Sequence, residues 1–149
     1  MVIIRPARQG DIDSLTELLK ILFTIEEDFV FDEMRQRRGL QMMLDNDRAC
    51  ILTAEADGQV IGMCSGQLTV STAEGGPALL VEDVVVRGDW HGRGIGRRLM
   101  ESLGAWAGEK RVSRLQLLAD RNNGPALDFY HKLGWQTTEL ICLRKRLSR

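Results

Sequence analysis

The feature that most restricts the fold is an apolar segment that runs into a glycine-rich turn and then into an amphipathic helix. Residues 79–86 are apolar and rich in valine apart from Glu82 and Asp83, which is typical of a central strand buried on both faces. A turn at 87–94 follows, and residues 95–108 repeat apolar side chains at helical spacing. This order predicts an α/β domain in which the helix packs back on a mixed sheet.

The rest of the sequence supplies further strands and helices for the same sheet. A length of 149 residues fits one domain, so we expect a single domain over residues 1–149. Asp57-Gly58 predicts a tight hairpin turn between two strands. The other expected elements are strands over 2–5, 49–56, 60–70 and 112–119, helices over 11–22, 32–44 and 125–133, and one or two closing strands within 135–147.

The charge and the hydropathy pattern exclude several classes of partner. The formal net charge is −1, so no overall basic field favours nucleic acid or an anionic membrane surface. No segment approaches the ~20 apolar residues that a membrane-spanning helix needs. Arg5, Arg8 and Asp11 interrupt the N-terminal segment, which therefore lacks the apolar core of a signal peptide. We expect a cytoplasmic protein with no nucleic-acid and no membrane partner.

The usual metal ligands are scattered along the chain. Cys50, Cys64 and Cys142 form no Cys-x-x-Cys pair, and His91 and His131 do not lie at ligand spacing to them. We expect reduced, mostly buried thiols and no metal site.

The turn at residues 92–96, Gly-Arg-Gly-Ile-Gly, has the properties of a phosphate site. A helix that begins here leaves its first backbone N–H groups unpaired and carries partial positive charge. Glycines let a ligand approach that backbone closely, which makes the turn a nest for phosphate. Arg93, Arg97 and Arg98 add positive charge. The alternative is a tight turn that serves only helix packing.

Two other phosphate motifs fit this turn poorly. A P-loop ends in Gly-Lys-Ser/Thr, whereas residues 96–98 are Gly-Arg-Arg. A dinucleotide-binding turn needs its third glycine one residue later and an acidic residue about 20 positions on, and residues 112–114 contain no acid.

Two motifs together resemble the GNAT superfamily of N-acetyltransferases. The family has Arg/Gln-x-x-Gly-x-Gly/Ala after its fourth strand, and residues 91–96 read His-Gly-Arg-Gly-Ile-Gly. A second motif, Asn-x-x-Ala with a tyrosine four residues on and then glycine and an aromatic residue, matches residues 123–126, Tyr130, Gly134 and Trp135. His91 departs from the family pattern, and the resemblance implies weakened rather than abolished cofactor binding.

The resemblance implies a fold of about seven strands flanked by about four helices, with acetyl-CoA between the fourth and fifth strands. Pantetheine would pair with the backbone of residues 84–86 like an added strand, and pyrophosphate would rest on the N–H groups of residues 92–97. The implied cofactor-binding residues are Val84, Val85, Val86, His91, Gly92, Arg93, Gly94, Ile95, Gly96, Arg97 and Asn123.

Transfer of an acetyl group to an amine needs a base for the ammonium and an acid for the departing thiolate. Tyr130 occupies the family's acid position, and a phenol stays protonated at neutral pH. Its alternative role is a buried tyrosine bound to backbone. Glu82 is the candidate base, because an acid on a central strand is costly unless paired or useful; its alternative is a buried ion pair with an arginine. Asp83 should face the opposite side, toward a helix.

The acceptor site is expected in the acidic and aromatic connection between the first two helices. Glu26, Glu27 and Phe29 are the candidate substrate-binding residues, since carboxylates attract cationic amines; the alternative is a solvated acidic loop. The resemblance thus implies an acetyl-CoA-dependent N-acetyltransferase acting on a primary amine of a small cationic molecule. Its alternatives are a protein lysine or N-terminal acetyltransferase and a non-catalytic acyl-CoA-binding regulator. A homodimer is one assembly that relatives adopt.

Overall fold

The hairpin closed by Asp57 and Gly58 organises the sheet. This computed structural model describes residues 1–26 and 28–148. Both turn residues have left-handed backbone, with φ of 51° and 78°, which is what a two-residue hairpin turn needs. Strands β2 (Ala49–Ala56) and β3 (Gln59–Ser71) run antiparallel from it, so the predicted hairpin is confirmed.

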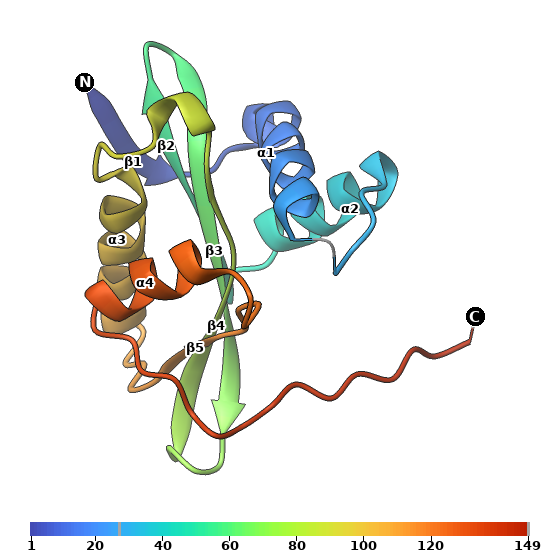
Figure 1. Ribbon diagram of the computed structural model, residues 1–149, viewed down its shortest axis with the longest axis vertical. Coiled ribbons are helices and arrows are strands. Elements are labelled where there is room, and N and C mark those ends of the chain that lie inside the picture. The colour runs from blue at the N-terminus through green and yellow to red at the C-terminus, as the bar shows by residue number, and fades with distance from the viewer. Residues whose placement is uncertain (27, 149) are drawn as a thin grey trace. The chain divides into compact units, whose positions relative to one another are not determined.

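The sheet has the order β1-β2-β3-β4-β5. Strand β1 (Val2–Pro6) pairs antiparallel with β2, and β4 (Gly76–Val86) pairs antiparallel with β3. Strand β5 (Leu115–Leu117) pairs in parallel with β4. The sheet is therefore mixed, as predicted, and Figure 1 shows the long β3–β4 pair at its centre.

The expected number of about seven strands is wrong, because the described residues form a sheet of 5 strands. The closing strands expected within 135–147 are absent from it: residues 139–148 are exposed and carry no strand. Apolar side chains at 140, 141, 143 and 147 keep no strict alternation, and Arg-Lys-Arg at 144–146 interrupts them. Neither side of this segment is uniformly apolar, which a half-buried strand requires.

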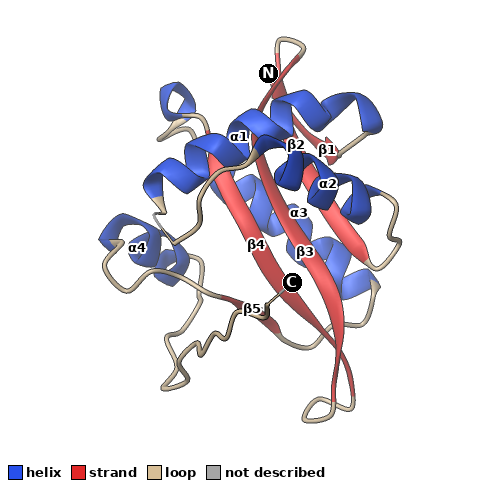
Figure 2. Cartoon of the chain, turned by 90° about the vertical axis from the view of Figure 1, so that its right-hand side faces the viewer, coloured by secondary structure: helices blue, strands red, loops and turns tan. Residues whose placement is uncertain are grey.

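Helices cover both faces of the sheet. Helices α1 (Ile12–Ile25) and α2 (Glu33–Leu44) lie on one face, and α3 (Ile95–Glu109) lies on the other (Figure 2). Each helix buries one stripe, as its apolar spacing predicts. No helix in the described part of the chain is both long and apolar enough to cross a membrane. The buried residues of the α1 side include Leu15, Leu18, Leu22, Met63 and Val85, and those of α3 are Ile95, Leu99, Met100, Leu103 and Ala107.

The chain forms two compact units, Met1–Leu117 and Leu118–Arg149, and each is described by itself. The first contains the sheet and α1 to α3. The second contains α4 (Gly124–Lys132), which begins at a proline-containing first turn and is followed by Gly134 with φ of 95°. The organisation as one domain stays a prediction.

Candidate active site

Strand β4 contains a bulge at the two acidic residues that interrupt its apolar sequence. Glu82 pairs with Ser65 and Val85 pairs with Met63, so two residues of β4 stand opposite one residue of β3. Asp83, the first of these two, has φ of 54°, in the left-handed region that bulges of this kind usually fill with glycine. The bulge breaks the regular alternation of the strand at this point.

Beyond the bulge, one edge of β4 is open. Strand β5 pairs only with residues 79–81 of β4, and no other described strand pairs with 82–86 on that side. Val84 and Val86 are half-buried and Val85 is buried. An open edge presents backbone N–H and C=O groups to which an extended ligand can pair.

Helix α3 begins with an uncapped turn. Its first turn starts at Gly94, whose φ is 76° and whose position lacks a side-chain cap. The amides of residues 95–97 open the helix, while the amide of Arg98 is the first that bonds back, to the Gly94 carbonyl at 3.1 Å. A Cβ at Gly92 or Gly94 would meet nothing within 4 Å. Within the described residues the amides of 95–97 have no hydrogen-bond acceptor, which fits an anionic group.

The side chains around this turn have specific contacts. His91 Nε2 lies 2.7 Å from the Val86 carbonyl oxygen; because that oxygen can only accept, Nε2 carries the hydrogen. His91 therefore joins the turn to the end of β4. The guanidinium carbon of Arg93 lies 4.6 Å from the Trp90 ring centroid. Arg97 pairs with Glu101 at 3.0 Å.

Arg98, predicted to add charge at the turn, instead donates to the Val2 carbonyl at 2.9 Å. The Arg98 side chain therefore takes part in the contact between α3 and β1, and its charge at the turn stays a prediction.

The acidic residues of the bulge have raised proton affinity. Partial burial raises the pKa of Glu82 above its usual value. Burial, with the like charges of Glu82 and Glu26, raises the pKa of Asp83 to about 7, although the nearby Ser65 hydroxyl lowers it. Within residues 1–26 and 28–148, neither Glu82 nor Asp83 forms an ion pair. The arginine partner considered for Glu82 is thus not found there.

The second unit holds the two remaining motif residues. The Asn123 side chain accepts a hydrogen bond from the Ala126 amide at 3.2 Å and so caps α4. Tyr130 lies on α4, half-buried, with its ring centroid 5.8 Å from that of Trp135. The Trp135 amide donates to the Tyr130 carbonyl at 3.0 Å. The motif therefore has a local structural role, whatever its role in catalysis.

A family model described as the acetyltransferase (GNAT) family matches residues 12–135. This chain belongs to the GNAT family of acetyltransferases. Enzymes of this family use acetyl-CoA as acetyl donor. The chain resembles mouse N-alpha-acetyltransferase 80, with 47% identity over 75 residues, 48% of the chain and 23% of that protein. It also resembles an aminoglycoside N(6')-acetyltransferase type 1 of Stenotrophomonas maltophilia, with 26% identity over 104 residues, covering 68% of each.

The fold of this GNAT chain is similar to that of a predicted acetyltransferase from Clostridium acetobutylicum solved with acetyl-CoA. The TM-score is 0.81 at 22% identity, over 97% of this chain and 96% of the other. The chain spans only 23% and 46% of the length of mouse N-alpha-acetyltransferase 80 and a Streptomyces lavendulae streptothricin acetyltransferase, respectively.

The acceptor candidates of this GNAT chain lie after α1. Glu26 follows the helix, and its amide bonds to the Leu22 carbonyl at 2.8 Å. Its negative charge contributes to the raised pKa of Asp83 in the bulge of β4. Phe29 is 39% exposed, and its ring centroid lies 5.9 Å from that of Phe23. Glu27 lies outside the described residues. In the part of the chain that the structure describes, no three ligand-type side chains could hold a metal ion.

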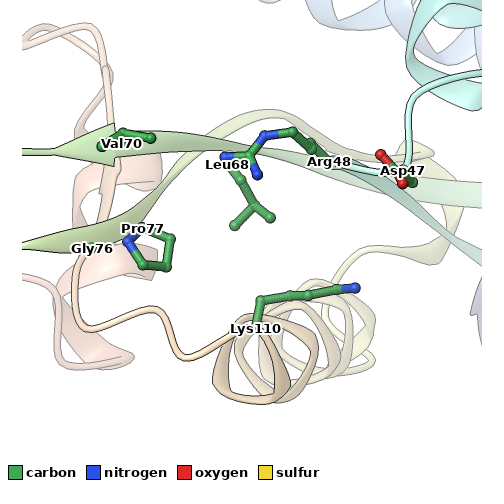
Figure 3. Close-up of a pocket in the computed structure, with 7 residues that line it drawn as sticks. All are labelled: Asp47, Arg48, Leu68, Val70, Gly76, Pro77 and Lys110. Carbon is green, nitrogen blue, oxygen red and sulfur yellow. The ribbon is translucent and has the colours of Figure 1, made fainter.

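Sequence reasoning missed a hollow at the opposite end of the β3–β4 pair. Its volume is about 400 Å³, and Figure 3 shows Arg48 and Lys110 beside the hairpin residues Gly76 and Pro77. It shares no residue with the predicted site. Reasoning from alternation also missed that the bulge places Asp83 near Glu82. The acidic pair in an apolar strand was the signal, but strand alternation alone cannot reveal a bulge.

Proposed function

We propose that this protein is an acetyl-CoA-dependent N-acetyltransferase that modifies a primary amine of a small cationic molecule. The observation that carries the proposal is the uncapped start of α3, which follows the open edge of β4 after the turn at residues 87–94. The start of α3 presents amide donors for a diphosphate, and the edge of β4 presents backbone groups that can pair with an extended chain. Membership of the GNAT family supports the same cofactor.

The residues of the turn and of β4 fit coenzyme A. The amides of residues 95–97 would hold the diphosphate, with Arg93 and Arg97 adding charge. The open backbone of Val84–Val86 would hold the pantetheine arm, and Asn123 would contact the cofactor from the second motif. His91 contributes through its bond to Val86. When bound, acetyl-CoA supplies an acetyl group activated as a thioester.

Two side chains would move the protons of the reaction. An amine attacks only as the free base, and lysine-like amines have a pKa of about 10.4. Glu82, directly or through a water molecule, would take the proton from the ammonium, and its raised pKa favours this role. Tyr130 would donate its phenolic proton to the departing sulfur.

The acceptor is proposed to be a cation. Glu26, Glu82 and Asp83 place negative charge on one region of the first unit, which favours an ammonium group. Phe29 is a further proposed substrate-binding residue, as is Glu27, which lies outside the described residues. The similarity to an aminoglycoside acetyltransferase supports a small polycationic substrate.

A second candidate is N-terminal acetylation of a protein. The local 47% identity to mouse N-alpha-acetyltransferase 80 favours it. It requires that the loop after α1 admit a peptide.

The deciding experiment measures thiol release from acetyl-CoA with a panel of polyamines, aminoglycosides and short peptides. Turnover confined to small cationic amines supports the proposal, and turnover confined to peptides supports the second candidate. Coenzyme A binding without turnover on any amine would leave a non-catalytic acyl-CoA-binding regulator. Absence of thermal stabilisation by coenzyme A at millimolar concentration would contradict all three.

The proposal also covers the location and the assembly of the enzyme. We expect a single-domain cytoplasmic enzyme able to form a homodimer, which sedimentation equilibrium of the purified protein would measure.

A further inference from the structure

We propose that Asp83 is a positioning residue for acetyl transfer: the β4 bulge sets its carboxyl beside Glu82, where its ionisation strengthens the attraction for the acceptor's ammonium and the basicity of Glu82. This inference rests on the role of Glu82 in the proposed function. It concerns a residue that regular strand alternation would direct to the other face of the sheet.

The register of the ladder places the Glu82 side chain on the face that carries α1. Glu82 and Ser65 are direct partners across the ladder, and the side chains of such partners point to one face. The Ser65 hydroxyl donates to the Glu82 backbone carbonyl at 3.0 Å, and its proximity to the Asp83 carboxyl lowers the pKa of that carboxyl. The next pair, Met63 and Val85, packs in the core that α1 covers.

Cys64, between Met63 and Ser65, marks the opposite face. Its Sγ lies 3.6 Å from the Leu99 carbonyl on α3. The ladder thus puts Glu82 on the α1 face, and the groups that act on the Asp83 carboxyl, Glu82, Ser65 and Glu26, come from the same side.

The groups that face Asp83 come from three elements. They are Glu82 on β4, the hydroxyl of Ser65 on β3 and Glu26 after α1. The two charged neighbours are acids, and the described residues provide no ion pair to Asp83. The backbone at Asp83 is held at φ of 54°, which costs a non-glycine residue energy and which strained sites often retain for a function.

Two adjacent carboxyls in this setting share their protons unequally. Asp83 is the more buried, and its pKa of about 7 means that it keeps a proton at slightly acidic pH. Above that pH Asp83 also ionises. The second charge then draws the cationic acceptor and raises the affinity of Glu82 for the ammonium proton. The proton passes from the ammonium to Glu82, and Asp83 is unchanged by the turnover.

The test compares the pH profile of kcat/KM for the amine in the wild type, Asp83→Asn and Asp83→Gly. Asparagine keeps the shape without the charge, and glycine suits the left-handed backbone, so the bulge is retained. Asp57 also has left-handed backbone, with φ of 51°, and lies in the distant hairpin turn. Asp57→Asn and Asp57→Gly are therefore matched controls.

We expect kcat/KM of the wild type and both controls to rise about 10-fold around pH 7, mainly through a lower KM for the amine. Both Asp83 variants should lose this rise while keeping wild-type affinity for coenzyme A. If kcat/KM of the Asp83 variants rises around pH 7 as much as that of the wild type, the inference is overturned. If Glu82→Gln keeps full turnover, the proposed function of Glu82 fails instead, so the two failures are distinguishable.

A second measurement is independent of turnover. Carbon-13 NMR can titrate the carboxyl carbon of Asp83 in the wild type and in Glu82→Gln. Removal of the like charge should lower the pKa of Asp83 by about one unit. An unchanged pKa would show that the two carboxyls do not interact and would also overturn the inference.

Discussion

Arg5 donates two hydrogen bonds to the carboxylate of Asp11, from Nη1 to Oδ2 at 2.8 Å and from Nη2 to Oδ1 at 3.0 Å. Its Nη2 also lies 2.8 Å from Oε1 of Glu55 on β2. The Arg8 amide donates to the same Asp11 carboxylate at 2.7 Å. One guanidinium thus ties β1 and β2 to the turn from which α1 starts.

Asp11→Asn should lower the free energy of unfolding by about 2 kcal/mol at pH 7, because a charge-assisted pair is lost. Arg5 holds the pKa of Asp11 below its usual value. The stabilisation is therefore complete above the unfolded-state pKa of about 3.9 and is lost as the pH falls through the lower, folded-state pKa. Urea unfolding of the wild type and Asp11→Asn should show that their difference in free energy of unfolding is present at pH 7 and disappears at acidic pH.

Asp13→Asn is the control for this prediction, since the Asp13 side chain is 85% exposed in its pair with Arg37. Asp13→Asn should lower the free energy of unfolding by less than about 0.5 kcal/mol. Equal losses for Asp11 and Asp13 would contradict the role given to the buried pair.

Gly94→Ala should weaken coenzyme A binding about 10-fold or more, because a Cβ would enter the space that the diphosphate needs. The left-handed backbone, with φ of 76°, adds a stability cost of about 1 kcal/mol. Gly58→Ala, at φ of 78° in the distant hairpin, carries the same strain. Calorimetry should therefore find weakened binding in the first variant and wild-type affinity in the second; equal affinities would remove the glycine turn as the diphosphate site.

Tyr130→Phe should reduce kcat about 100-fold, the size of a lost general acid. Affinity for coenzyme A should stay within about twofold, since the ring contacts with Phe129 and Trp135 do not need the hydroxyl. Single-turnover kinetics and calorimetry on the same sample separate the two. Undiminished turnover would exclude Tyr130 as proton donor.

Cys142 should react with a thiol reagent long before the other two cysteines. It is exposed, whereas Cys50 and Cys64 are buried. Burial raises the pKa of Cys50 to about 11 and also raises that of Cys64, so little thiolate forms at pH 8. Mass spectrometry of a labelling time course would detect one fast site per chain in the wild type and none in Cys142→Ser.

Local signals predicted the elements that depend on local chemistry. The hairpin turn at Asp57 and Gly58 and the turn before α3 follow from residue type. The helix expected over 32–44 begins after Asp32, whose side chain accepts from the Arg35 amide. The candidate acid and base come from motifs whose catalytic roles stay predictions.

Long-range pairing decided what local signals could not. Strand β5 contains only 3 residues, although the apolar sequence around it is longer, because pairing with β4 ends at Leu117. Residues 135–147 looked strand-like but have no partner strand in the described sheet. The bulge at Asp83 is likewise a property of two strands together, invisible in either alone.

The extra residue in β4 also means that the number of residues in this strand determines which face each side chain after the bulge points to. Val85 packs in the α1 core, and Val86 and Leu99 of α3 both lie beside Gly62, only because the bulge at Asp83 adds one residue to β4. Deleting that single position would restore a regular strand and exchange the surroundings of each later side chain or move the glycine turn by one step. Relatives that vary freely in side chain here should therefore conserve the spacing between the acidic pair and the start of the helix.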